Sequence, residues 1–454
     1  MNIPLDIWYH IASFLPLDTL VTLQHLHPFF REAVERAEYH ALCLSEYTPE
    51  RVLTELRCVL SSVYCCAGTH IVPSNPSISD LVKAVHVRPW IEAPVQHPQG
   101  WRRRLKNALH KAIDPKYPQL MSAQEAQRRL SKHLQGLTDV IRPLSRVSEY
   151  TLEWDESSQF FPEFFNDLLR PSLVLLGNRL VKISLKVPPA KLGKLVSLSL
   201  PHLEELHVQL CTGEETKDEV SRHLDGFIVF LNNLFRSLRV LKVSTTKTSK
   251  HLDVSSFFHR LGTFRCLVHF SLLIPITGLH LSNKLVLVRF IEKHAASLEY
   301  LELGSSSFYY PPEPSNPRLQ LWAQETLQLL ASHRAMVNLR TLQLGTRPLW
   351  APLSPVQQSL RYLSPQLRSL SLIDRDLLLS EVVALLGAST RITSLTIAIK
   401  RLSPELLEKL ASRLPMLHNL ELRFKQIIGH EDEDADVPPG NTADELVGSI
   451  LYYI

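Results

Sequence analysis

One short apolar pattern recurs along most of the chain and limits the folds that the chain can adopt. The pattern is apolar-x-x-apolar-x-apolar, and from Val147 onward its copies start 23 to 41 residues apart. Its last residues alternate between apolar and polar, which is typical of a strand with one buried face. Such a chain folds by stacking similar units, because one unit cannot bury its apolar face alone. The copies begin at Val82, Val147, Leu180, Leu203, Leu238, Leu267, Leu298, Leu339, Leu367, Ile392 and Leu417.

Segments with helical periodicity lie between the copies. Apolar residues recur there at steps of three and four, in residues 223–235, 284–294, 319–333 and 404–414. A strand and a helix that alternate in each unit predict a parallel sheet on the concave side and helices on the convex side. We therefore expect an α/β fold, built as a repeat solenoid.

Residues 146–426 resemble the leucine-rich repeat domains that are commonly joined to F-boxes. The clearest copies are Leu-Glu-Tyr-Leu-Glu-Leu from Leu298 and Leu-Arg-Ser-Leu-Ser-Leu from Leu367. The Asn or Cys that this family places after the last leucine is absent, which implies an irregular arc. Those positions hold Thr246, Pro275, Ser306, Arg347, Arg375 and Lys425.

The first 44 residues carry a different, wholly helical pattern. Apolar residues fall at helical spacing in three groups, which Pro16 and Pro28 separate. About 40 residues are few for an independent core, so such a module packs against a partner or a neighbouring domain. The segment resembles an F-box through Ile3-Pro4-Leu5-Asp6-Ile7-Trp8, Phe14-Leu15-Pro16, Leu20-x-x-Leu23 and Phe29-Phe30-Arg31. Residues 39–44 resemble the segment that follows the box in many fungal members.

This resemblance implies a role in protein ubiquitination. An F-box binds a Skp-type adaptor and, through it, a cullin–RING ubiquitin ligase, while the leucine-rich repeats bind a protein substrate that the sequence does not name. Apolar side chains left outside the small helical core would contact the adaptor. Matching the family pattern gives the adaptor-binding candidates, which the sequence does not divide between core and contact: Ile3, Pro4, Ile7, Trp8, Leu15, Pro16 and Leu20.

Polar residues between the apolar positions of the strands should face solvent on the concave side. The first strands carry lysine and histidine there, so an acidic or phosphorylated segment is the expected ligand if this face holds a partner. A solvated surface with no partner is the alternative. The substrate-binding candidates are Lys182, Lys186, His207, Lys242, His269, Tyr300 and Glu302.

Composition and motifs argue against an enzyme. The 15 glycines among 454 residues are about half of the usual fraction. The sequence contains no Gly-x-Gly-x-x-Gly or Walker-type phosphate loop, no His-Glu-x-x-His, no Cys-x-x-Cys and no Gly-x-Ser-x-Gly. We therefore expect no catalytic residues, no cofactor and no metal site.

Two alternatives to the ligase role stay open. One is a repeat scaffold whose helical cap never meets an adaptor. The other is a nucleic-acid-associated protein that uses the basic cluster in residues 101–111, although a net charge of +4 makes nucleic acid an unexpected partner.

The expected organisation has four segments. These are an F-box in 1–44, a linker with a first repeat-like segment in 45–145, leucine-rich repeats in 146–426, and an acidic loop with a C-terminal cap in 427–454. The cap is expected to be a helix over residues 444–454. The chain lacks a signal-peptide pattern and any apolar run long enough for a membrane span, so we expect a soluble cytoplasmic or nuclear protein that does not bind membranes.

Overall fold

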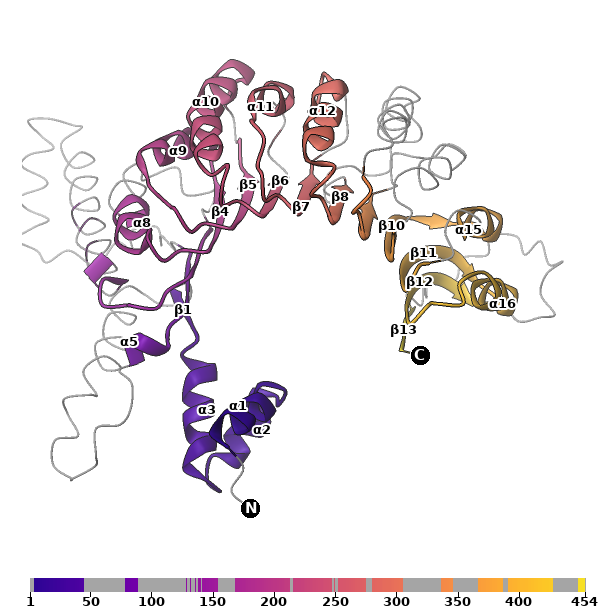
Figure 1. Cartoon of the computed structure of the whole chain (residues 1–454), viewed down its shortest axis with the longest axis horizontal. Helices are drawn as coiled ribbons and strands as arrows, with labels where there is room; N and C mark the ends of the chain where they lie inside the picture. The colour runs from indigo at the N-terminus through magenta and orange to yellow at the C-terminus, as the bar shows by residue number, and fades with distance from the viewer. Residues whose placement is uncertain are drawn as a thin grey trace, which may run out of the picture. The chain divides into compact units, whose positions relative to one another are not determined.

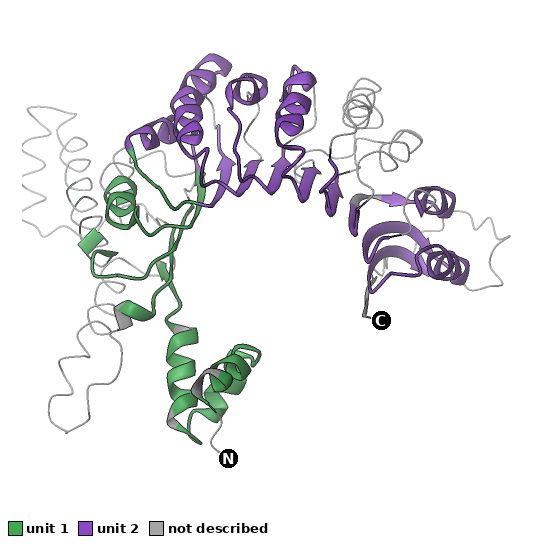
Figure 2. Cartoon of the chain, viewed as in Figure 1, with its two compact units in different colours: residues 1–186, 198–203 green, residues 187–197, 204–454 purple. Residues whose placement is uncertain are grey.

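The chain forms two compact units, which Figure 2 colours separately. The first unit contains residues 1–186 and 198–203, and the second contains residues 187–197 and 204–454. The structure is a computed structural model, and it describes residues 4–44, 78–88, 128, 131, 135, 138–139, 141–153, 168–212, 215–246, 249, 252–274, 280–304, 336–345, 366–386, 391–427 and 448–453.

Three helices open the first unit (Figure 1): α1 (Leu5–Ser13), α2 (Leu17–Leu23) and α3 (Pro28–Glu38). Prolines set their boundaries, because Pro4 and Pro16 directly precede α1 and α2. Pro28 is the first residue of α3, where a helix does not need the missing N–H group. The imidazole Nδ1 of His27 caps α3 by accepting a hydrogen bond from the N–H of Phe29 at 3.1 Å. The three helices that the periodicity predicts are therefore present.

A parallel sheet follows the helices in the first unit. Its strands lie in sequence order, each paired with the one before it. The chain enters the sheet two residues after α3, and the carbonyl of His40 accepts hydrogen bonds from the N–H groups of Lys83 and Ala84. The strands and the remaining helices of this unit are β1 (Ala41–Leu44), α5 (Ile78–Leu81), β2 (Ala84–Val87), β3 (Glu149–Glu153), α8 (Arg170–Leu176) and β4 (Lys182–Val187).

The second unit repeats the alternation of strand and helix. Its strands are β5 (Glu205–Leu210), β6 (Val240–Thr245), β7 (His269–Leu273), β8 (Tyr300–Gly304), β9 (Thr341–Leu344), β10 (Ser369–Leu377), β11 (Ser394–Leu402), β12 (Asn419–Ile427) and β13 (Gly448–Tyr453). From β6 onward each strand pairs with the preceding one, and the pairings are parallel except that between β12 and β13. The helical elements are α9 (Pro189–Leu192), the 3-10 helix η2 (Gly193–Ser197), α10 (Lys217–Asn233), α11 (Ser255–Arg260), α12 (Lys284–His294), α15 (Leu379–Leu386) and α16 (Pro404–Arg413).

The core of the second unit lies between the sheet and these helices. Helices α10, α11 and α12 lie side by side on one face of the strands β5 to β8 (Figure 1). The strands alternate as the sequence predicts, with every second residue of β5 and β6 buried. Aromatic rings fill the space behind them, and the ring of Phe290 lies 5.3 Å from Phe258 and 5.1 Å from Phe270 between centroids. Burial of such rings is a large favourable contribution to stability.

A carboxylate ties together the loops that lead into these helices. Asp253 accepts hydrogen bonds from the N–H of Ser255 at 3.0 Å and from the hydroxyl of Ser282 at 2.7 Å. The ammonium of Lys217 lies 3.2 Å from the same carboxylate. Burial alone would raise the pKa of Asp253, but these hydrogen bonds outweigh it and lower the pKa to about 2. The charged carboxylate therefore interacts with polar groups from three successive strand–helix repeats of the second unit.

Two buried histidines in the second unit are held in the neutral form. The Nδ1 of His294 donates to the carbonyl of Phe290 at 2.7 Å, and its Nε2 accepts the N–H of Phe264 at 2.9 Å. The Nε2 of His280 lies 2.9 Å from the carbonyl of Ser249. Burial lowers the pKa of both imidazoles, because a buried site disfavours the charged form.

One predicted element is wrong and several are confirmed. Residues 448–453 form the strand β13, antiparallel to β12, where the sequence predicted a C-terminal helix. The helix predicted over 223–235 begins earlier, at Lys217, because Thr216 and Glu219 form a capping box. The helices predicted over 284–294 and 404–414 are present, as is a strand within 82–87.

Some predictions fall outside the described residues. These are the helix over 319–333, the basic cluster in 101–111 and the acidic loop. Within the described part of the chain, no helix is both long and apolar enough to cross a membrane.

Phe290→Ala tests the aromatic core of the second unit. The substitution removes ring contacts and leaves a cavity, so we expect the free energy of unfolding to fall by about 3–5 kcal/mol. Leu285, on the same helix, is 44% exposed, and Leu285→Ala should cost less than about 1 kcal/mol. Urea denaturation measures both values, and equal losses would contradict the assignment of the core.

The buried histidines predict that stability falls in acid. Because the pKa values of His280 and His294 are lower in the folded chain, the unfolded chain binds more protons below about pH 6.5. Their contribution is thus present above that pH and is lost as the pH falls. We expect a lower urea midpoint at about pH 5 than at about pH 7.5, and a weaker pH dependence in His294→Gln. A midpoint that does not move, or that rises in acid, would show that these groups are not held neutral.

Candidate functional site

The helical module at the N-terminus has a small core of its own. Ala12, Leu20, Phe29, Ala33 and Val34 are buried, and four partly buried side chains pack against them. The ring of Tyr9 lies 4.8 Å from that of Phe29, and the ring of Trp8 lies 5.7 Å from that of Phe30. The core thus uses one face of α1, one residue of α2 and the inner face of α3. The packed side chains are Trp8, Tyr9, Leu15 and Phe30.

Among the residues of this module that the structure describes, six large apolar side chains are exposed, and we call them the N-terminal apolar surface. On α1 and the residue after it, Ile7, Ile11 and Phe14 are spaced four and three residues apart, which places them on one side of the helix. Leu17 and Val21 have the same relation on α2. Phe14 is 73% exposed and Leu26 is 74% exposed. Apolar residues gathered in this way on a short segment are typical of a protein contact surface. The six are Ile7, Ile11, Phe14, Leu17, Val21 and Leu26.

The structure divides the adaptor-binding candidates into three groups. Ile7, Pro4 and Pro16 are exposed and available to a partner. Trp8 and Leu15 are half-buried against the core, and Leu20 is only 4% exposed, so it belongs to the core. Ile3 lies outside the described residues. Leu17 and Val21 were missing from the prediction, although their spacing of four residues carries the signal.

The second candidate site is the face of the sheet opposite the helices, in the second unit. Parallel register places the outward side chains of β5 to β9 in two rows across the strands. Most of them are half-buried, and Ser271 is fully buried, where the sequence predicted solvent-facing positions. The first row holds Glu205, Val240, His269, Tyr300 and Thr341, and the second row holds His207, Lys242, Ser271, Glu302 and Gln343.

Side-chain contacts run along these rows. The rings of His269 and Tyr300 are stacked, with centroids 3.8 Å apart and an angle of 14° between the planes. The hydroxyl of Tyr300 donates to Oε1 of Gln343 at 3.1 Å. The hydroxyl of Ser271 donates to Oε2 of Glu302 at 2.5 Å. These contacts fix the orientation of the aromatic pair and of the carboxylate.

Burial and neighbouring charges shift two pKa values on this face. Burial, with the positive charges of Lys242 and His207, lowers the pKa of His269 to about 4. Burial, with the nearby carboxylate of Glu302, raises the pKa of Tyr300 to about 12. At neutral pH the imidazole is therefore uncharged and the phenol keeps its proton.

The structure brings five of the seven substrate-binding candidates together on this face. They are His207, Lys242, His269, Tyr300 and Glu302. The other two, Lys182 and Lys186, lie on β4 in the first unit, opposite Glu149 and Glu153. The ammonium of Lys182 is 3.2 Å from the carboxylate of Glu149. This ion pair offsets the positive charge that the sequence predicted there.

Comparison with known proteins leaves the family open. No protein-family model matches the chain. No curated protein matches it either. Among the described residues, no three His, Cys, Asp or Glu side chains are grouped as metal ligands would be. The two surfaces above are therefore the features from which a function has to be argued.

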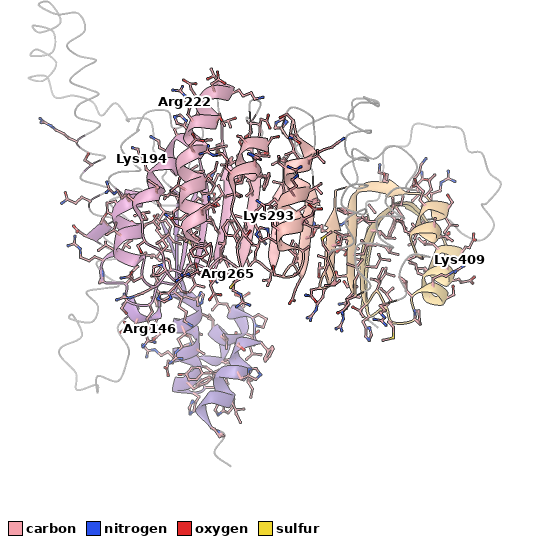
Figure 3. The ribbon with its side chains drawn as sticks, turned by 45° about the horizontal axis from the view of Figure 1, so that its top comes forward. Arg146, Lys194, Arg222, Arg265, Lys293 and Lys409 are labelled. Carbon is pink, nitrogen blue, oxygen red and sulfur yellow. The ribbon has the colours of Figure 1, made fainter. Side chains whose placement is uncertain are left out.

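The titration of His269 tests the geometry of the sheet face. In full-length protein labelled with 13C at histidine, we expect the His269 imidazole to titrate near pH 4. Lys242→Met removes a neighbouring positive charge and should raise this pKa by about half a unit. Lys409→Met, at an exposed site on α16 (Figure 3), should leave the pKa of His269 unchanged. Equal effects of the two substitutions would contradict the electrostatic influence of Lys242 on His269.

Proposed function

We propose that the chain is the substrate receptor of a Skp–cullin–F-box ubiquitin ligase. In this proposal the N-terminal helical module acts as an F-box, and the N-terminal apolar surface binds the Skp-type adaptor. The sheet of the second unit belongs to a leucine-rich repeat arc that binds the protein substrate. The chain itself supplies no catalytic group, and it accelerates ubiquitin transfer by raising the effective concentration of the substrate near a separate enzyme.

The observation that carries the proposal is the unequal division of apolar side chains in the helical module. A module of some 40 residues needs most of its apolar side chains to form its own core. Yet Ile7, Ile11 and Phe14 follow one another along one exposed side of α1. An amphipathic helix whose apolar side is uncovered fits an apolar groove on a partner. Such contacts gain affinity from a few large side chains near the centre of the interface.

The repeated units provide support for the second half of the proposal. Parallel strands joined through helices leave one face of a sheet without a covering layer. In the second unit that face carries imidazole, ammonium, phenol, amide and carboxylate groups at fixed spacing across five strands. A surface of this kind selects a partner through its polar groups.

Ile7→Asp and Phe14→Asp test adaptor binding by the full-length chain. A carboxylate at the centre of an apolar contact loses its hydration without gaining a partner. We expect the amount of purified Skp-type adaptor retained by either variant to fall at least about tenfold. Binding is measured by pull-down and by calorimetry with the purified adaptor.

Ala37→Asp is the matched control, because Ala37 is exposed on α3 and lies outside the N-terminal apolar surface. Thermal unfolding of all three variants must stay close to that of the wild type. Leu20 is unsuitable for this test because its substitution would unfold the module. Retention of the adaptor by folded Ile7→Asp and Phe14→Asp would contradict the proposed ligase role. Failure of the wild type to bind any Skp-type adaptor would favour a repeat scaffold.

A further inference from the structure

Six arginines of the second unit lie at one edge of its sheet. Because β5 to β12 are parallel, the connections that precede these strands all reach the edge where the strands begin. Backbone hydrogen bonds hold the residues before neighbouring strands in register, and the N–H of Arg368 donates to the carbonyl of Arg340 at 2.8 Å. We call the six arginines the arginine edge: Arg236, Arg239, Arg265, Arg340, Arg368 and Arg391.

This edge is far more basic than the chain as a whole. The full sequence has 49 lysines and arginines against 45 aspartates and glutamates. Among the described residues of these connections, the six arginines are exposed, the acidic residues are Glu204 and Glu299, and there is no lysine or aspartate. The excess charge is therefore carried by guanidinium groups, whose planar fork binds a carboxylate through two hydrogen bonds. The described residues of the connections are 204, 234–239, 261–268, 295–299, 336–340, 366–368, 391–393 and 414–418.

Two members of the arginine edge already contact carboxylates of this chain. The Nε of Arg239 lies 3.9 Å from Oε2 of Glu204, and Nη1 of Arg340 lies 3.7 Å from Oε2 of Glu299. These two pairs show that guanidinium groups at this edge accept a carboxylate laid across neighbouring strands.

The other four arginines form no ion pair with any residue that the structure describes. The guanidinium of Arg236 lies over the ring of Phe235, 5.1 Å from its centroid, a contact that does not use its N–H donors. Arg391 is two residues before Thr393, whose hydroxyl donates to the carbonyl of Arg368 at 3.2 Å. Arg368 and Arg391 therefore belong to adjacent strands and present two unpaired charges close together. The four are Arg236, Arg265, Arg368 and Arg391.

The surroundings of these arginines favour protein carboxylates over a nucleic-acid backbone. Binding of single-stranded nucleic acid relies on exposed aromatic rings on which bases stack. Among the described residues of these connections, Phe264 is buried and Phe235 is half-buried beneath Arg236. The carboxylates of Glu204 and Glu299 also interrupt the row of positive charge, which penalises an unbroken run of phosphates. A peptide places its carboxylates on flexible side chains that reach the arginines between these two positions.

We infer that the arginine edge binds an unphosphorylated acidic segment of a protein partner, a short run of aspartate and glutamate residues that crosses the starts of the strands. Adjacent strands are about 4.8 Å apart, and an extended peptide advances about 3.3 Å per residue. Consecutive acidic residues can therefore contact guanidinium groups of successive strands. The inference goes beyond the proposed function, because this edge contributes neither to the N-terminal apolar surface nor to the outward face of the sheet.

A fluorescein-labelled peptide of ten glutamates is the probe, titrated into the full-length chain at about 50 mM salt. We expect an increase in fluorescence anisotropy that saturates with a dissociation constant on the order of 10 μM. The double variant Arg368→Gln, Arg391→Gln should weaken binding at least about fivefold, because it removes two unpaired guanidinium groups. Absence of binding by the wild type would overturn the inference.

The double variant Arg222→Gln, Arg289→Gln is the matched control. It removes the same charge from exposed positions on α10 and α12 (Figure 3 labels Arg222), away from the starts of the strands. This variant should bind the peptide within about twofold of the wild type, and thermal unfolding should show that both variants are folded. Equal weakening by the two double variants would mean that only the net charge matters, which overturns a site at the arginine edge.

Two further measurements separate this site from other sources of binding. A single-stranded decamer of deoxythymidine should bind more weakly than the glutamate peptide, and equal or tighter binding would overturn a protein partner in favour of nucleic acid. Affinity for the peptide should stay constant between about pH 6 and pH 9, because guanidinium and glutamate keep their charges there. Affinity that rises toward pH 6 would assign the binding to histidines and contradict the arginine edge.

Discussion

Burial of one face of every strand is the constraint on which the structure depends. In the second unit, every second residue of β5 and β6 is buried, on the side of the sheet where the helices lie (Figure 1). No strand has enough apolar surface to be stable alone. Stacking therefore has to continue from unit to unit. Polar contacts also link successive strand–helix repeats. Asp253 contacts Lys217, Ser255 and Ser282, which lie near the starts of α10, α11 and α12, so the position of each of these loops depends on its neighbours.

The same constraint prepares the opposite face for binding. Once the inward residues are fixed, the pleat sends every other side chain outward in register with those of the adjoining strands. His269 and Tyr300 become stacked neighbours although they are 31 positions apart in the chain. Because both side chains are half-buried, their pKa values differ from those of free side chains. At neutral pH the imidazole is uncharged and the phenol keeps its proton. A rigid scaffold thus supplies groups whose orientation is set before any partner arrives.

The sequence predicts the parts of this fold that follow from local periodicity. Alternation identified Leu241 and Val243 as inward residues of a strand, and steps of three and four identified the helix Lys284–His294. The strand Gly448–Tyr453 was predicted as helix because a short apolar run suits either structure. Pairing with the free edge of β12 decides its conformation, and that edge is distant in sequence. Likewise, the sequence placed Lys182 and Lys242 in one basic group, and only coordinates show that Glu149 pairs with the first of them.

The N-terminal module shows why apolar content alone does not reveal an interface. Leu17 and Leu20 are three residues apart on the same short helix, yet the first is 45% exposed and the second is 4% exposed. Leu20 belongs to the same buried cluster as Phe29, and Leu17 does not. Apolar side chains in excess of what a small core can hold must lie outside it. In a short helical module these side chains lie on the exposed side of the helices. Binding of a partner there removes the unfavourable free energy of their contact with water.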